Sequence, residues 1–114
     1  MLITAALANV LYRAALSAAA SLPSHDAVDA WRATFGADFG ESAGGLPVAF
    51  AAAGDSVLRR LRMHVVSDDA DHLYEQLNRT DGRQYNAKDL TWSYAEMFGA
   101  LHQRRLALDA IALA

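Results

Sequence analysis

The stretch Leu73–Ala95, LYEQLNRTDGRQYNAKDLTWSYA, decides the fold, because it separates a helical first part of the chain from a last helix. It combines a carboxylate, several amides, aromatic residues and an Asp-Gly pair, and such polar, turn-rich stretches are typical of loops. The remainder is different, since the 114 residues include 25 alanines and alanine is the best helix former. The sequence therefore predicts an all-α fold with about four helices and a long irregular loop before the last helix.

The first predicted helix covers residues 2 to about 19. Four apolar residues recur at helical spacing and are predicted to form its buried face, namely Ile3, Leu7, Val10 and Ala14. The opposite face carries a polar line of Asn9, Arg13 and Ser17. Three alanines before Ser21 resemble a signal-peptidase site, but a positively charged start is lacking. We interpret this segment as a structural helix, and expect no segment to span a membrane, which takes about 20 mostly apolar residues.

Two further helices are predicted on either side of a glycine-rich loop. Ser24 can cap the second helix and Gly36 can end it, with an apolar stripe of Val28, Trp31 and Phe35. The loop 37–45 lacks the preceding strand and the Gly-Lys-Ser/Thr of a phosphate loop, so we interpret it as a connector. Pro47 suits the first turn of the third helix, which is expected to fade near Ser67. Its predicted buried line is Phe50, Ala53, Val57, Leu61 and Val65.

Residues 68–88 are predicted to be irregular, and loops of this length in compact domains are usually functional or disordered. The last helix is expected to start near Leu90, capped by Asp89, with Leu90, Tyr94, Met97 and Leu101 buried. Residues 1–105 then form the main unit, and residues 106–114 are either a helical extension or a frayed tail.

The charge of the chain argues against two classes of partner. The formal net charge is −3 and the isoelectric point is near 5.7. Proteins that bind nucleic acids usually carry a basic stripe, and polybasic patches attract membranes. We therefore expect neither a nucleic acid nor a membrane as a partner.

One group of residues contains metal-ligand types: His64, Asp68, Asp69, Asp71 and His72. Their spacing matches no ligand motif, and polar residues at a helix end are usually solvated. We therefore expect no metal site, and nothing in the sequence calls for a cofactor.

The central stretch is the stronger candidate for chemistry. Hydrolysis of a sugar bond needs a carboxylate that activates water, amides that hold hydroxyl groups, and an aromatic ring that stacks on the sugar. Glu75 is such a carboxylate, Gln76 and Asn86 are such amides, and Trp92 is such a ring. The alternative interpretation, a capped helix preceded by a polar loop, stays open on composition alone.

At these residues the sequence resembles the glucoamylases, the glucan 1,4-alpha-glucosidases of glycoside hydrolase family 15. Glu75-Gln76, Asp81-Gly82, Gln84, Ala87 and the run DLTWSYA of residues 89–95 stand as in the last active-site segment of that family, without gaps. Residues 2–16, LITAALANVLYRAAL, resemble the alanine-rich helix of the family that ends in a Leu-Tyr pair. The resemblance is strong over residues 73–95 and weaker over the rest.

The resemblance implies an alpha/alpha toroid of six helical hairpins with its active site at one end of the barrel. It implies an inverting hydrolase that releases glucose from the non-reducing ends of starch chains. Glu75 stands where the family has its general base, and an inverting mechanism needs a second carboxyl group, the general acid, roughly 6.5–9.5 Å away. Gln76 follows the base as in the family, and Trp92 stands at an aromatic position beside the substrate subsites.

The chain also departs from the family. Asn86 stands where the family often has a serine bonded to the base, although its NH₂ group can still donate to Glu75. None of its carboxylates matches the general-acid segment, so we expect a C-terminal fragment of the catalytic domain that is inactive alone. Its expected partners are starch or malto-oligosaccharides and the missing N-terminal part of the barrel. The family is extracellular, but no convincing signal peptide opens this chain. The alternative is a catalytically inactive helical remnant that acts as a binding or interaction module.

Overall fold

The structure is a computed structural model, and it describes residues 1–21, 23–41, 45–65 and 69–113. Its elements in chain order are α1 (Leu2–Ala20), α2 (His25–Phe35), α3 (Gly45–Arg62), β1 (Gln76–Leu77), β2 (Gln84–Tyr85) and α4 (Thr91–Ala112). The predicted all-α class with about four helices is confirmed. The small antiparallel pair β1–β2 lies within the irregular segment and was not predicted from the sequence.

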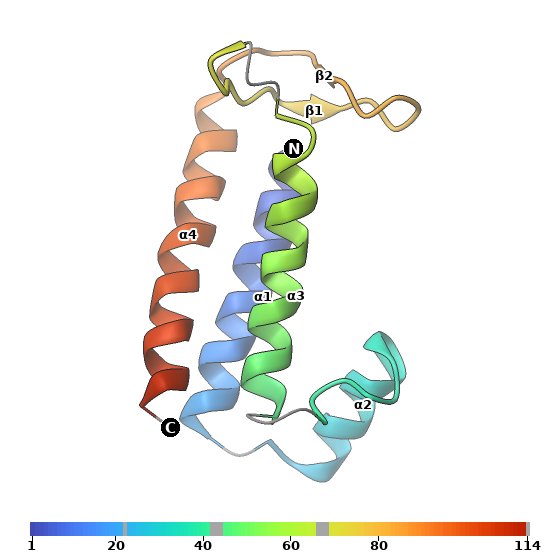
Figure 1. Cartoon of the computed structure of the whole chain (residues 1–114), viewed down its shortest axis with the longest axis vertical. Helices are drawn as coiled ribbons and strands as arrows, with labels where there is room; N and C mark the ends of the chain where they lie inside the picture. Colours follow the sequence, from blue (N-terminus) through green and yellow to red (C-terminus); the bar gives the residue numbers. More distant parts are fainter. Residues whose placement is uncertain (22, 42–44, 66–68, 114) are drawn as a thin grey trace.

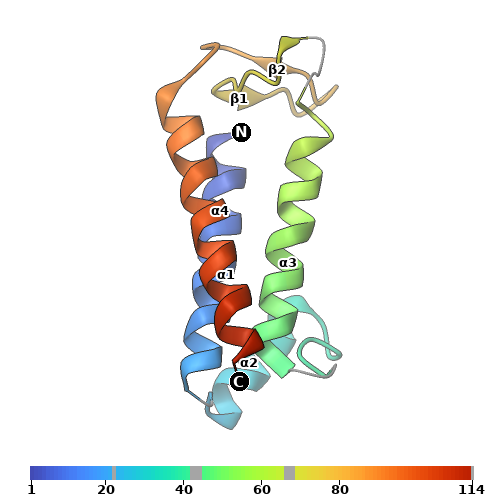
Figure 2. The ribbon, with the colours of Figure 1, turned by 60° about the vertical axis from the view of Figure 1, so that its left-hand side comes forward.

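Three long helices form a bundle with α1 at its centre. α1 and α4 start at the same end and run side by side in the same direction, whereas α3 runs antiparallel to both (Figures 1 and 2). α1 packs extensively against α3 and α4, while α3 and α4 contact each other much less. The segment with β1 and β2 lies over the end where α1 and α4 begin, and α2 lies at the opposite end.

The buried face of α1 differs from the predicted one. Small residues and one tyrosine face the neighbouring helices: Ala5, Ala8, Leu11, Tyr12 and Ala15. Ile3 and Val10, predicted to be buried, are 82% and 61% exposed. The helix is apolar nearly all round, so periodicity could not single out the buried face. Alanines occupy the interface because they allow the two neighbouring helices to approach closely.

The expectation about membrane spans also needs correction. α1 has 19 residues and a mean hydropathy of 1.4, which make it long and apolar enough to cross a membrane. Core helices of water-soluble proteins and signal sequences meet the same two criteria. In the structure α1 contacts both α3 and α4, and 28% of its apolar window is buried.

α2 is held against α3 by aromatic rings. Ser24 caps α2 as predicted, since its side chain accepts a hydrogen bond from the backbone N–H of Ala27. Trp31 meets Phe50 of α3 edge-on, with ring centroids 4.9 Å apart. Phe39, from the turn after α2, also contacts Phe50 at 5.1 Å, so the buried Phe50 ring is the centre of this cluster.

The outcome for α3 and α4 is mixed. On α3, Phe50 and Leu61 are buried as predicted, but the helix ends at Arg62, and Ser67 lies outside the described residues. On α4, the cap at Asp89 is wrong, because the helix begins at Thr91 without a side-chain cap. Leu101, predicted to be buried, is 46% exposed. Smaller residues fill the interface of α4: Ser93, Ala100 and Ala107.

A polar cluster ties the three helices of the bundle together. The Tyr12 hydroxyl of α1 donates to Asp55 of α3 at 2.6 Å, and Arg104 of α4 donates to both oxygens of Asp55, at 2.7 and 3.2 Å. These hydrogen bonds, that of Arg104 first, hold the pKa of Asp55 below its usual value. Burial and the neighbouring Asp55 raise the pKa of Tyr12, so the phenol stays protonated and can donate.

The Asp55 carboxylate is expected to make the stability of the fold depend on pH. Its pKa is lowered in the folded state, so its contribution is complete above the unfolded value of about 3.9 and is lost as the pH falls through the folded value. Asp55→Asn should cost about 2 kcal/mol at pH 7, and the difference from the wild type should shrink below about pH 4. Urea unfolding across the pH range measures this. Asp109→Asn, at an exposed pair with Arg105, is the control and should differ little from the wild type.

Gly54 is expected to be essential for the contact between α1 and α3. A Cβ atom at this position would lie 2.7 Å from the ring of the buried Tyr12. Gly54→Ala should therefore destabilise the fold by about 1–3 kcal/mol, although alanine favours helices. At the matched control Gly99 of α4, a Cβ would meet only the end of the Asn9 side chain, at 3.1 Å. If Gly99→Ala lost as much stability as Gly54→Ala in urea unfolding, close packing at Tyr12 would not be the cause.

Candidate functional site

The candidate site lies in the segment between α3 and α4, over one end of the bundle (Figure 1). Its backbone is fixed to the helices by apolar and polar contacts. Leu73 is buried together with Met1 and Ala5 of the first helical turns and Leu61 of α3. This small second core positions the residues that follow Leu73 in the sequence.

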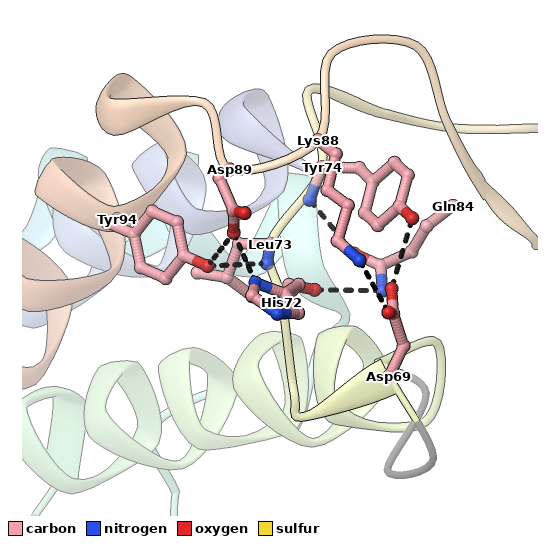
Figure 3. A network of polar contacts seen from close by, with 8 residues as sticks. All are labelled: Asp69, His72, Leu73, Tyr74, Gln84, Lys88, Asp89 and Tyr94. Atoms are coloured by element: carbon pink, nitrogen blue, oxygen red, sulfur yellow. Dashed lines mark hydrogen bonds and ion pairs between the residues drawn. The ribbon is translucent and has the colours of Figure 1, made fainter.

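A network of polar side chains joins the two ends of the segment, as Figure 3 shows. In one half, Asp69 accepts hydrogen bonds from Lys88 at 2.6 Å and from the Tyr74 hydroxyl at 3.0 Å. These contacts, that of Lys88 first, lower the pKa of Asp69, and the hydrogen bond to Asp69 raises the pKa of Lys88. Residues from the two ends of the segment are thus joined by an ion pair.

The other half of the network is centred on Asp89. Its carboxylate accepts a 2.6 Å hydrogen bond from the Tyr94 hydroxyl and contacts Nδ1 of His72. The bond from Tyr94, followed by the contact with His72, lowers the pKa of Asp89. The Tyr94 oxygen in turn accepts a hydrogen bond from the backbone N–H of the buried Leu73, at 3.0 Å. Asp89 therefore fixes the start of the segment to the first turn of α4 and does not cap that helix.

One side-chain amide and one hydroxyl group fix the backbone around Tyr74. Gln84 accepts from the Tyr74 backbone N–H and donates to the His72 carbonyl, both at 3.1 Å. The Ser93 hydroxyl of α4 donates to the Tyr74 carbonyl at 3.0 Å and is itself buried. The backbone that enters Glu75 is therefore held by hydrogen bonds from two directions.

Glu75, the proposed general base, directly follows the hydrogen-bonded backbone of Tyr74 and is half-buried. Its backbone N–H donates to the Ala87 carbonyl at 2.9 Å, and its carbonyl accepts from the backbone N–H of Leu2 at 3.5 Å. Its carboxylate accepts a 3.4 Å hydrogen bond from the Gln76 amide. Glu75 and Gln76 also line a cavity of about 320 Å³ against the first turn of α1.

The other predicted site residues lie around this position without forming a closed pocket with it. Gln76 contacts both Glu75 and the Tyr85 hydroxyl. Trp92 is 62% exposed, and its indole N–H donates to Glu96 of the next turn at 3.3 Å. Asn86 is exposed with a positive φ of 72°, and among the described residues the carboxylate of Glu75 bonds to Gln76 and not to Asn86. The hydrogen bond that the Asn86 amide could donate to Glu75 is therefore not formed in this structure.

The metal-ligand types near the start of the segment are engaged elsewhere. Asp69 bonds to Lys88, Asp71 pairs with Arg62 at 3.2 Å, and His72 contacts Asp89. Asp68 lies outside the described residues. Within the described part of the chain, no group of three or more His, Asp or Glu side chains is placed to hold a metal ion.

The hydrogen bonds that hold the site in place were not predicted from the sequence. Tyr74, Gln84 and Tyr94 bond to groups 5 to 21 positions away in the sequence. Such pairings carry no periodic signal, because they form within irregular backbone. A usable clue was the unusual number of polar and aromatic residues at both ends of the stretch, because such side chains need hydrogen-bonding partners when they are partly buried.

Comparison with known proteins places a glucoamylase-like region within this helical chain. A glucoamylase from Blastobotrys adeninivorans is 45% identical over 51 residues. The match covers 45% of this chain and 8% of the relative, so the chain corresponds to a small part of that enzyme. No family model matches the chain. No solved structure matches it either.

Removing the Tyr94 hydroxyl is expected to loosen the segment. Tyr94→Phe would leave the backbone N–H of the buried Leu73 without a partner, which should cost about 1–3 kcal/mol. Tyr85→Phe is the matched control, because it removes a hydroxyl whose partner Gln76 is near the surface, and should change stability by less than about 0.5 kcal/mol. Urea unfolding monitored by circular dichroism measures both. Equal losses would mean that the Leu73–Tyr94 contact contributes nothing specific.

Proposed function

We propose that the chain is part of an inverting glucoamylase-type glycoside hydrolase, which releases glucose from the non-reducing ends of starch and related alpha-glucans. The observation that carries this proposal is the 45% identity to a glucoamylase over 51 residues. The ordered set Glu75-Gln76, Asp81-Gly82 and DLTWSYA in the sequence points to the same family. The chain would contribute the general base, and helices outside these 114 residues would contribute the general acid.

The arrangement of helices supports a place in a double-layered barrel. In an alpha/alpha toroid, neighbouring helices of one layer are parallel, and each is joined to the next through an antiparallel helix of the other layer. α1 and α4 are such parallel neighbours, and α3, which comes between them in the sequence, is antiparallel to both (Figures 1 and 2). The segment with Glu75 lies at the end where α1 and α4 begin, which would be the active-site end of the barrel.

The surroundings of Glu75 suit a base that acts on water. Its backbone is fixed on both sides, so the carboxylate would be held in position without a large entropic cost on reaction. The Gln76 amide donates to the carboxylate and would help to orient it. The adjoining cavity offers space for a water molecule and a sugar ring. Inversion requires the second carboxyl group to stand roughly 6.5–9.5 Å away across the substrate.

Trp92 and Asn86 would then act on the substrate side. The exposed Trp92 ring would stack on a sugar face in the completed barrel. Because Asn86 does not bond to Glu75, its amide is available to a substrate hydroxyl, and we assign it substrate binding and not support of the base. We also propose that the enzyme acts on starch outside the cell, because the family that the sequence resembles is extracellular.

The exposed apolar side chains of the bundle support a role as part of a larger assembly. Ile3, Leu7 and Val10 of α1 and Phe98 of α4 are all 49–82% exposed. Apolar surface of this kind on several helices marks contact with further protein. The same surface is also the observation that favours the alternative function, an inactive helical module that binds another protein.

The isolated chain is expected to release no glucose from maltose or soluble starch. It carries the proposed base without an acid to protonate the leaving group, and loss of such a group costs at least about 10²–10⁴-fold in rate. A coupled glucose assay over several hours measures this. Turnover by the pure chain would contradict the assignment of a missing general acid.

The role of Glu75 can be tested in a chimera of the Blastobotrys adeninivorans glucoamylase in which this chain takes the place of a region of equal length that contains the matched segment. Glu75→Gln keeps the shape of the side chain and removes the base, so activity should fall by about 10³-fold or more while the protein stays folded. The control is Glu41→Gln, which should retain activity. Glu41 follows the turn after α2 and lies beside Arg32 of that helix. An active Glu75→Gln chimera would refute the assigned role. An inactive unsubstituted chimera that is folded would favour the interaction module.

A further inference from the structure

A second cavity lies between the end of α3 and the hairpin loop that follows β1. Its volume is about 380 Å³, and its lining includes Arg60, His64, Arg79 and Asp81. Arg60 and His64 are four residues apart in the sequence, so α3 and the turn after it present them on the same side. Leu77 of β1 borders both this cavity and the one beside Glu75. The two cavities are therefore neighbours with different chemistry.

The loop that closes this cavity is held in one shape by hydrogen bonds. Asn78 and Arg83 face each other across it, with the Asn78 N–H donating to the Arg83 carbonyl at 2.8 Å. The Asn78 side chain accepts from the Thr80 N–H at 2.8 Å, and the Gly82 N–H donates to the Asn78 carbonyl at 2.8 Å. Arg79 therefore projects from an ordered turn, which lowers the entropic cost of a contact with a ligand.

Gly82 allows His64 to reach the loop. A Cβ atom at this position would lie 2.6 Å from the imidazole ring, and the φ of 73° also favours glycine. The imidazole is half-buried against the loop backbone and not free in solvent. The cavity thus has a fixed wall formed by His64 and the hairpin loop.

The charge of the cavity is unbalanced. Arg60 and Arg79 form no ion pair with any side chain in the described ranges, whereas Arg62, Arg104 and Arg105 each pair with an aspartate. The single carboxylate of the lining, Asp81, is directed to Arg83, accepting from its backbone N–H at 2.9 Å and lying 4.0 Å from its guanidinium. Two guanidinium groups and an imidazole remain to act on a ligand.

We propose that this cavity binds a small oxyanion of the phosphate or sulfate type, either free or as the ester group of a sugar. Guanidinium groups present planar pairs of N–H donors that match the oxygens of such anions, and each can bind through two hydrogen bonds. Arg60 would approach from α3 and Arg79 from the hairpin loop, while the His64 imidazole would donate a further hydrogen bond. The site is separate from Glu75 and does not depend on the proposed hydrolysis.

The proposal is tested by titrating the whole chain with inorganic phosphate at low ionic strength, with binding followed by isothermal calorimetry and by amide NMR shifts. The shifts of the wild type should saturate and be largest at residues 78–82 and 60–64. Arg60→Ala with Arg79→Ala should weaken binding at least tenfold. Arg13→Ala, which removes an exposed arginine of α1, should leave it unchanged.

Three further comparisons complete the test. Sodium chloride at the same ionic strength should produce no saturating shifts, because a monovalent spherical ion does not match the guanidinium donors. Glucose 6-phosphate distinguishes the two forms of the ligand, since tighter binding than phosphate indicates an esterified anion and equal binding indicates the free ion. Circular dichroism confirms that each variant keeps its helices. Phosphate binding that the double variant retains in full, or an absence of saturable binding to the wild type, would overturn the proposal.

Discussion

The contact on which the rest of the structure depends is the cluster of Tyr12, Asp55 and Arg104. Each residue comes from a different long helix, and together they satisfy a partly buried carboxylate with hydrogen bonds from a phenol and a guanidinium. α3 and α4 touch each other little, so their relative position follows from what each shares with α1 and from this cluster. A partly buried carboxylate must be paired to be tolerated, and this requirement selects one packing of the three helices.

This packing fixes where the segment between α3 and α4 can lie. Once α1 and α4 begin at the same end, the chain must return from the end of α3 across their first turns (Figure 1). Leu73 enters the small core formed with Ala5 and Leu61, and the network of Figure 3 ties both ends of the segment to α4. Glu75 therefore stands at the end of the bundle as a consequence of helix packing, and Leu77 of β1 lines both the cavity beside the proposed base and the proposed anion site.

The sequence predicted the local features well and the long-range ones poorly. The bounds of α1 and the Ser24 cap were predicted, since helix propensity and capping depend on neighbours within one turn. The buried face of α1 was not, because alanines pack closely on its neighbours while the larger Ile3 and Val10 stay exposed. Asp89 was predicted as a cap from its position, but Tyr94 and His72 bind its carboxylate. The segment and Glu75 were identified through a family resemblance, and the roles assigned to Glu75, Gln76 and Trp92 stay predictions.

Native-state hydrogen exchange followed by NMR tests most directly whether the segment is a fixed part of the fold. The backbone N–H groups of Leu73, Glu75 and Asn78 donate to Tyr94, Ala87 and Arg83 respectively, so they should be protected against exchange. Their opening free energies should approach those of amides in the middle of α1, because the segment and the bundle are held together by the same contacts. Exchange of these three amides at the rate of an unstructured chain, with the helices still protected, would contradict the account.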